Sequence, residues 1–102
     1  MTETEFLELA EAEMVRLQDA VEARCDDADC TRSGNVLTIE LDEGGEAVVN
    51  IQTPMREIWL ASYLGGMHFA READGRWVNP RDGRTLEASL FAALEGLRAR
   101  NG

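Results

Sequence analysis

The chain has 102 residues, of which 44% are hydrophobic, so it is long enough to bury a core, and we expect residues 1–102 to form a single domain. It carries 20 Asp and Glu residues against 10 basic residues, a formal net charge of -10. An acidic protein repels phosphate backbones and anionic headgroups, which disfavours nucleic acid and membranes as partners. Metal cations and basic proteins remain as expected partners.

The acidic residues are concentrated in the first half of the chain. Residues 1–46 contain 14 Asp and Glu and 3 Arg, whereas residues 47–102 contain 6 Asp and Glu and 7 Arg. The first half therefore accounts for the net negative charge, and this asymmetry is the main clue that the composition gives.

The sequence favours a cytoplasmic protein. No segment approaches the roughly 20 apolar residues of a membrane span, and the acidic N-terminus lacks the basic start of a signal peptide. Cys25 and Cys30 are too few for a secreted disulfide scaffold, so we expect both thiols to be reduced.

Residues 4–24 have the periodicity of an amphipathic helix, with Thr4 as a candidate cap. The apolar stripe consists of Phe6, Leu9, Ala10, Met14, Leu17 and Val21. At about 100° per residue, the opposite side gathers carboxylates. These are Glu8, Glu11, Asp19 and Glu22.

The middle of the chain alternates apolar and polar residues between short turns, which predicts antiparallel strands. The expected strands are 28–32 at an edge, 35–41, 46–52, 57–62, 67–69 and 76–78, with Gly65-Gly66 as a turn.

A last helix is expected to follow Thr85, which is a good cap. Its apolar stripe contains Leu86, Leu90, Phe91, Leu94 and Leu97. Two helices flanking a meander predict an α+β, two-layer sandwich, with both helices on one face of the antiparallel sheet.

Several carboxylates of the first helix lie three or four residues apart, and Asp26, Asp27 and Asp29 continue the series. Such like-charge pairs destabilise a helix by about 0.2–0.5 kcal/mol each. Three interpretations stay open: a solvated face, weak binding of hard cations through oxygen ligands, and docking to a basic partner.

Trp59 lies between the inward residues Ile58 and Leu60, so alternation places it on the open face of the sheet. If residues 53–56 form a four-residue loop, Asn50 lies opposite Trp59 and Gln52 shares that face. An exposed Trp beside amides is typical of a protein-binding hot spot. The alternative is that Trp59 packs on a neighbouring side chain.

Catalytic signals are weak. His68 is the only histidine, and a lone His is more often a strand residue with a satisfied hydrogen bond than a ligand. No nucleophile–base pair or oxyanion-hole motif is present, so we do not expect an enzyme.

The stretch Asn50-Ile51-Gln52-Thr53-Pro54 followed by Glu57-Ile58-Trp59-Leu60-Ala61 resembles the frataxin signature, and Gly65-Gly66-Met67-His68-Phe69 resembles the next strand of bacterial frataxins. The acidic first helix, the Asp27-Ala28-Asp29-Cys30 segment and the closing helix also match in order. The resemblance covers nearly the whole chain.

Bacterial frataxins are implied to be small αβ sandwiches that bind ferrous or ferric iron weakly and bind the cysteine desulfurase and scaffold proteins of iron–sulfur cluster assembly. The resemblance places the iron site on an acidic ridge formed by Glu11, Asp19, Glu22, Asp26, Asp27 and Asp29. It places the partner-binding patch at Asn50, Gln52 and Trp59. We expect a monomer that regulates the assembly machinery or supplies its iron.

Two other functions compete with this one. A pure protein-interaction module would modulate the desulfurase and bind metal only incidentally. An iron-storing ferroxidase would need a two-metal site, and the Glu-x-x-His pairs of ferritin-like bundles do not occur in this sequence.

Overall fold

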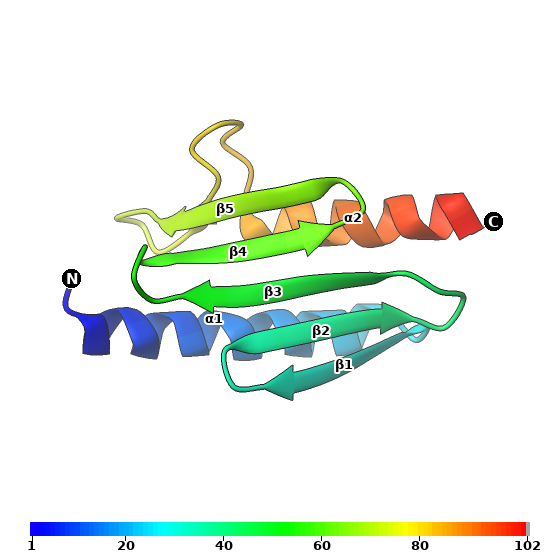
Figure 1. Cartoon of the computed structure of the whole chain (residues 1–102), viewed down its shortest axis with the longest axis horizontal. Coiled ribbons are helices and arrows are strands. Elements are labelled where there is room, and N and C mark those ends of the chain that lie inside the picture. Colours follow the sequence, from blue (N-terminus) through cyan, green and yellow to red (C-terminus); the bar gives the residue numbers. More distant parts are fainter. Residues whose placement is uncertain (102) are drawn as a thin grey trace.

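The computed structural model of the protein describes residues 1–101, which form two layers (Figure 1). One layer is a six-stranded antiparallel sheet in the order β1-β2-β3-β4-β5-β6, and helices α1 and α2 cover one of its faces. The elements are α1 (Glu3–Arg24), β1 (Ala28–Ser33), β2 (Val36–Leu41), β3 (Glu46–Gln52), β4 (Glu57–Ser62), β5 (Gly65–Arg71), β6 (Trp77–Val78) and α2 (Leu86–Asn101). The predicted α+β sandwich is confirmed.

Helix α1 begins earlier than the sequence indicated, because Thr2 and not Thr4 caps it. The Thr2 hydroxyl accepts a hydrogen bond from the Glu5 backbone N–H at 3.1 Å, and the Glu5 carboxylate accepts one from the Thr2 N–H. This capping box satisfies two of the free donors at the helix start. The buried side follows the predicted stripe with two differences: Leu9 is only half-buried, and Glu13 is buried as well.

The strands 46–52 and 57–62 were predicted with their observed bounds. The predicted turn at Gly65-Gly66 is wrong: both glycines belong to β5, and Tyr63 and Leu64 form the two-residue connection between Ser62 and Gly65. A glycine pair is a common turn signal, but Gly65 is needed here for its left-handed φ of 105° at the strand start.

Helix α2 is capped by Thr85 as expected, since its hydroxyl accepts from the Ala88 N–H at 3.1 Å. The two helices run side by side in the same direction (Figure 1). Arg16 pairs with Glu87 near the start of α2, and the guanidinium of Arg24 lies 3.8 Å from the ring of Phe91 further along.

The core lies between the sheet and the helices. Alternate residues of β2, β3 and β4 are buried there, and the residues between them face outward. Trp77 is 4% exposed and contacts Phe6 edge-on, so it is a core residue. None of the helices within residues 1–101 is long and apolar enough to cross a membrane. The sheet's outer face is left uncovered by helices (Figure 1).

Candidate functional site

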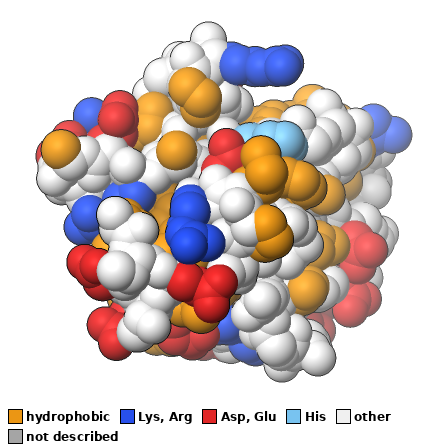
Figure 2. Space-filling model, turned by 60° about the vertical axis from the view of Figure 1, so that its left-hand side comes forward, with side chains coloured by type: hydrophobic (Ala, Val, Ile, Leu, Met, Phe, Trp, Pro, Cys, Tyr) orange, Lys and Arg blue, Asp and Glu red, His pale blue; other side chains and the backbone are white. Residues whose placement is uncertain are grey.

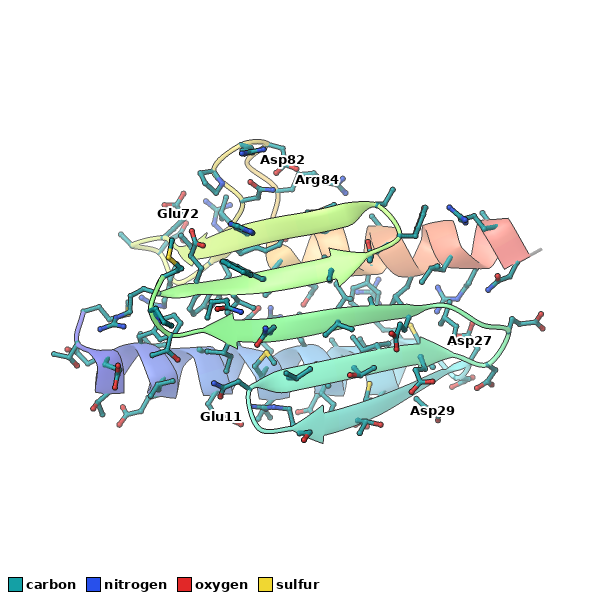
Figure 3. All side chains as sticks on the ribbon, viewed as in Figure 1. Glu11, Asp27, Asp29, Glu72, Asp82 and Arg84 are labelled. Carbon is teal, nitrogen blue, oxygen red and sulfur yellow. The ribbon has the colours of Figure 1, made fainter. Side chains whose placement is uncertain are left out.

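The six residues of the predicted acidic ridge come from three consecutive segments (Figure 3). Glu11, Asp19 and Glu22 lie on α1, Asp26 and Asp27 follow it in the turn, and Asp29 lies on β1. The sequence placed them on one side of the molecule, and the structure shows that two of the six are held in ion pairs.

Glu11 is clamped by an arginine of the sheet edge. Both of its carboxylate oxygens accept from Arg32 of β1, at 2.6 and 3.1 Å. This bidentate pair lowers the pKa of Glu11 below its ordinary value, mainly through the hydrogen bond from Arg32.

Asp27 is held from the opposite side, by helix α2. Arg98 donates to its two oxygens at 2.8 and 3.0 Å, and this hydrogen bond lowers the pKa of Asp27. Arginines thus hold the ridge near both its ends, Arg32 at Glu11 and Arg98 at Asp27.

The other four ridge residues make no ion pair within residues 1–101, and they are Asp19, Glu22, Asp26 and Asp29. All four are exposed. The thiol of Cys30 lies near two of these carboxylates. Its pKa is raised to about 11, mainly by burial and to a smaller extent by the negative charges of Glu22, Cys25 and Asp29. The free carboxylates therefore gather where α1 ends and β1 begins.

No three His, Cys, Asp or Glu side chains of the described chain converge into a ready metal cage. The ridge offers separate carboxylate oxygens that a hydrated cation could bridge. Such oxygens suit hard and borderline cations and select poorly among them.

A second row of carboxylates crosses the outer face of the sheet. Asp29 lies opposite Glu40, and Glu40 lies opposite Glu46 on its other side. Side chains directly opposite one another come within about 4.5–5.5 Å at Cβ, so these like charges repel. Glu40 and Glu46 were not among the predicted site residues, because their proximity to Asp29 depends on strand register.

The three residues of the predicted partner patch lie on the outer face. Asn50 lies directly opposite Trp59, and Gln52 lies opposite Glu57, as the four-residue loop required. Trp59 is half-buried between the fully buried Ile58 and Leu60. Strand parity therefore placed all three patch residues correctly.

Two further residues fix the position of Trp59. His68 of β5 lies opposite it, with the two rings stacked at a centroid distance of 4.2 Å and an angle of 7°. The indole N–H donates to Glu57 Oε1 at 2.8 Å, and His68 Nδ1 lies 3.5 Å from the same oxygen. Figure 2 shows the histidine at the surface among hydrophobic side chains.

Trp59 therefore packs on a neighbouring side chain, as the alternative interpretation expected, and it also remains partly exposed on the outer face. Parity alone could have identified Glu57, since it lies two residues before Trp59. His68 could not be assigned, because the mistaken turn at Gly65-Gly66 shifts the register of β5 against β4.

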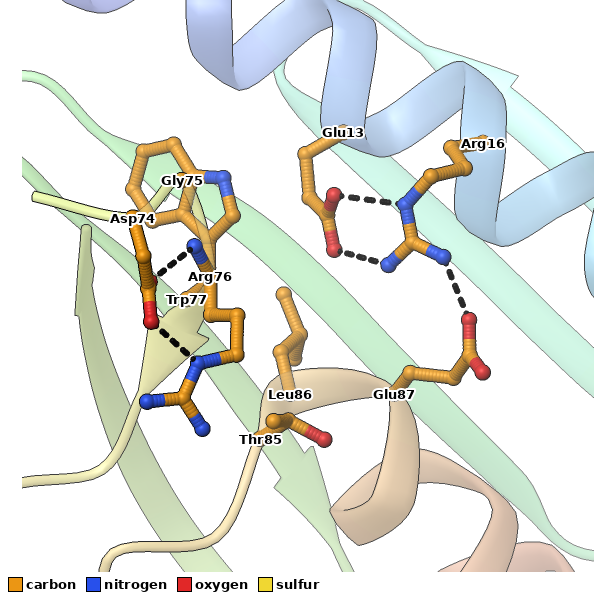
Figure 4. Close-up of a pocket in the computed structure, with 9 residues that line it drawn as sticks. All are labelled: Glu13, Arg16, Asp74, Gly75, Arg76, Trp77, Thr85, Leu86 and Glu87. Carbon is orange, nitrogen blue, oxygen red and sulfur yellow. Dashed lines mark hydrogen bonds and ion pairs between the residues drawn. The ribbon is translucent and has the colours of Figure 1, made fainter. Parts of the chain in front are cut away.

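A cavity of ≈ 370 Å³ lies away from both surfaces (Figure 4). Buried Glu13 accepts two hydrogen bonds from Arg16, which also reaches Glu87 of α2 at 2.5 Å. On the other wall Arg76 donates to Asp74. The charged side chains that line this cavity pair with one another. Because Arg16 of α1 pairs with Glu87 of α2, we interpret these residues as a structural contact between the two helices.

The fold and the two surfaces define a class: a small α+β sandwich with an acidic helix–strand junction and a tryptophan on an open sheet. Residues 1–97 match the family model described as a frataxin-like domain. The chain belongs to the frataxin family.

Its relatives include two proteins named iron-sulfur cluster assembly protein CyaY. The one from Ralstonia pickettii is 47% identical over 94 residues, which cover 88% of this chain and 82% of the relative. The one from Janthinobacterium is 45% identical over 107 residues, which cover 100% and 91%.

Solved structures agree with this assignment. A frataxin from Psychromonas ingrahamii is 28% identical and superimposes with a TM-score of 0.87, over 95% of this chain and 91% of that one. Trimeric frataxin from the yeast Saccharomyces cerevisiae, complexed with ferrous iron, is 33% identical with a TM-score of 0.70, over 86% and 83%.

Proposed function

We propose that this protein acts in iron–sulfur cluster assembly, as a monomer that binds iron weakly on the acidic ridge and docks to the cysteine desulfurase and its scaffold protein. The observation that carries the proposal is the group of four exposed ridge carboxylates near the α1–β1 junction that make no ion pair within residues 1–101, whereas Glu11 and Asp27 are paired with arginine. The names of the CyaY relatives and of the ferrous yeast complex support it.

Iron would be cargo on this surface. Ferrous and ferric ions accept carboxylate and water oxygens, and an exposed site lets them exchange readily. Asp19, Glu22, Asp26 and Asp29 would be occupied first, because their oxygens are not engaged by arginine. Glu11 and Asp27 join only when the cation displaces Arg32 or Arg98.

The negative charge of the ridge would also attract the desulfurase. Fixed negative charge steers a basic patch on the desulfurase toward the ridge, and this attraction weakens with salt. The patch of Asn50, Gln52 and Trp59 then supplies short-range contact, with Trp59 held in place by His68 and Glu57. Iron and a basic partner therefore compete for the ridge.

The second candidate function is a pure interaction module with incidental metal binding. The lack of a converging ligand set in residues 1–101 favours it. The two candidates differ in one result: an interaction module binds the desulfurase equally well with and without iron, and regains binding in proportion to restored charge.

Titration with ferrous iron under argon, followed by amide NMR, tests the iron site. We expect line broadening at Asp19, Glu22, Asp26 and Asp29 before Glu11. The triple variant Asp19→Asn, Glu22→Gln, Asp26→Asn should lose most of it. Broadening centred away from residues 11–29 would contradict the assignment.

The matched control removes the same charge elsewhere. The triple variant Glu3→Gln, Glu43→Gln, Glu72→Gln neutralises three exposed carboxylates outside the ridge. It should keep the wild-type broadening pattern, since net charge alone does not create a site.

A further inference from the structure

Strand β5 has an open edge along most of its length. Its neighbour β6 pairs only with Ala70 and Arg71, at the end of β5. The Glu72 N–H also bonds toward this side, to Arg76 O at 2.7 Å. Because backbone groups alternate in direction along a strand, Gly66 and His68 point their N–H and C=O groups to the same side.

Nothing within residues 1–101 pairs with these backbone groups of Gly66 and His68. They face a groove of ≈ 200 Å³ whose opposite wall is the segment Asn79, Pro80 and Arg81. A groove of this volume is smaller than the about 300–1,000 Å³ of sites for drug-sized ligands.

The two edges of the sheet differ in how well they resist strand addition. Edge strand β1 carries Asp29 and Arg32, and charged residues discourage pairing with another chain. The open part of β5, residues 65–69, contains no Asp, Glu, Lys or Arg. A Cβ added at Gly66 would meet no atom within 4 Å, so its outer face is clear as well.

The segment that borders this groove contains more basic than acidic residues, whereas the ridge is acidic. Residues 65–85 contain four arginines and three acidic residues. Within residues 1–101 the side chains of Arg71, Arg81 and Arg84 make no ion pair, whereas Arg76 is paired with Asp74. Figure 3 shows Arg84 on the connection that rises beside β5.

One carboxylate, that of Glu57, also lines the groove. Its Oε1 already accepts the indole N–H of Trp59 and lies 3.5 Å from His68 Nδ1. Glu57 is therefore engaged on the Trp59 side, and Arg81 is the charged group on the opposite wall.

We propose that β5 binds an extended, acidic segment of a partner protein by strand addition, with its backbone on Gly66 and His68 and a carboxylate on Arg81. Main-chain pairing supplies affinity in this mode, and side-chain contacts supply the preference for acid. The site is separate from the iron ridge, and its proximity to Trp59 through His68 lets one partner cover both.

The probe is a blocked heptapeptide, TVEVEVT, with TVRVRVT as its basic counterpart, added to the intact protein. We expect the acidic peptide to slow hydrogen exchange at the Gly66 and His68 amides and to shift their NMR signals saturably. The basic peptide should do neither. Equal effects of the two peptides, or no protection at these amides, would overturn the proposal.

A matched pair of variants isolates the backbone. Gly66→Pro removes the outward N–H, whereas Gly66→Ala keeps it and adds a methyl group into open space. The proline variant should bind TVEVEVT at least tenfold more weakly, and the alanine variant should bind it as wild type does. Equal binding by both variants would refute strand addition.

Charge reversal provides a test that does not depend on the proline variant's folding. Arg81→Glu should weaken TVEVEVT binding and permit TVRVRVT binding, while Arg24→Glu, whose guanidinium lies over Phe91 on the helical layer, should change neither. If Arg81→Glu binds TVEVEVT as wild type does, the proposed recognition of acid is wrong.

Two further results distinguish strand addition at β5 from self-association and from binding at the iron ridge. Sedimentation of the protein alone as a dimer that Gly66→Pro abolishes would identify a second copy as the occupant and overturn the proposal. The reversal of Asp19, Glu22 and Asp26 to Lys should leave TVEVEVT binding intact, so failure of the iron site and failure of this site are distinguishable.

Discussion

The acidic ridge and the outer sheet face differ in the forces by which each would attract or hold a partner. The ridge presents exposed carboxylates whose electric field reaches about 10 Å at 0.1 M salt. The sheet face presents Trp59, fixed by the stacked His68 and by its hydrogen bond to Glu57, and it acts only on contact. The proposed function therefore predicts that attraction and retention of a partner depend on separate residues.

The outer sheet face is itself divided in what it contributes to stability. Around Trp59 its polar groups are satisfied locally, whereas nearer the β1 edge Glu40 lies between Asp29 and Glu46 and repels both. Arg32 and Arg98 pair with Glu11 and Asp27, so they do not neutralise these three carboxylates. A stretch that carries unrelieved like charge is expected where charge serves function.

The largest effect is expected from reversing the ridge. Asp19→Lys, Glu22→Lys, Asp26→Lys should weaken desulfurase binding by about 10- to 1,000-fold at low ionic strength, because electrostatic steering is worth that much in association rate. Isothermal titration at two salt concentrations measures it. Restoring one acid at a time should recover affinity stepwise, and a single residue restoring all of it would point to a specific contact in place of a field.

Trp59→Ala should come next. Loss of a central aromatic anchor costs about 2 kcal/mol, which is about 30-fold in affinity. Trp59→Phe should retain part of the binding, since a phenyl ring still stacks on His68. Surface-bound desulfurase in a kinetic binding assay reports the change. Unaltered binding by Trp59→Ala would leave the tryptophan as a packing residue only.

Arg98→Gln should destabilise the protein, because it removes the bidentate partner of Asp27. The folded-state pKa of Asp27 lies below its ordinary value of 3.8. The pair therefore stabilises the fold above that pH, and its contribution is lost as the pH falls through the lowered pKa.

Thermal unfolding of wild type and Arg98→Gln between pH 7 and pH 2 measures this linkage. The difference in midpoint should stay constant near neutrality and shrink below about pH 4. Arg100→Gln is the control, since Arg100 stacks on Tyr63 at 4.6 Å and holds no carboxylate within residues 1–101. A difference that widens on acidification would refute the role of the ion pair.

The smallest effect is expected at Glu40. Glu40→Gln relieves repulsion from Asp29 and Glu46, and cross-strand pairs of this kind contribute about 0.2–1 kcal/mol each. Urea unfolding should therefore report a stabilised variant at low salt and a smaller gain at 1 M salt. Glu43→Gln, in the β2–β3 turn, should show no comparable gain.

Periodicity and parity predicted the parts of the molecule that each residue's own neighbours determine. The buried stripe of α1, the inward residues around Trp59 and the cap at Thr85 all follow from local spacing. Thr4 was wrong as a cap because two threonines two residues apart both fit the pattern, and only Thr2 is followed by a glutamate at the third helical position.

Contacts between segments that lie far apart in the chain could not be predicted from the sequence. Arg98 lies 71 residues from Asp27 and Arg32 lies 21 residues from Glu11, so no spacing rule connects them. The same holds for the stack of Trp59 on His68, which depends on the register of β4 and β5. Sequence therefore indicated which carboxylates share a side, and the structure distinguishes the paired from the unpaired ones.

The most direct test of the division between ridge and sheet face is stopped-flow binding to the desulfurase across ionic strength. It would compare wild type, the Asp19, Glu22 and Asp26 reversal, and Trp59→Ala. We predict that the reversal abolishes the salt dependence of the association rate and leaves dissociation unchanged, whereas Trp59→Ala keeps the salt dependence and dissociates faster. If Trp59→Ala alters the salt dependence, or the reversal acts only on dissociation, the two surfaces do not have separate roles.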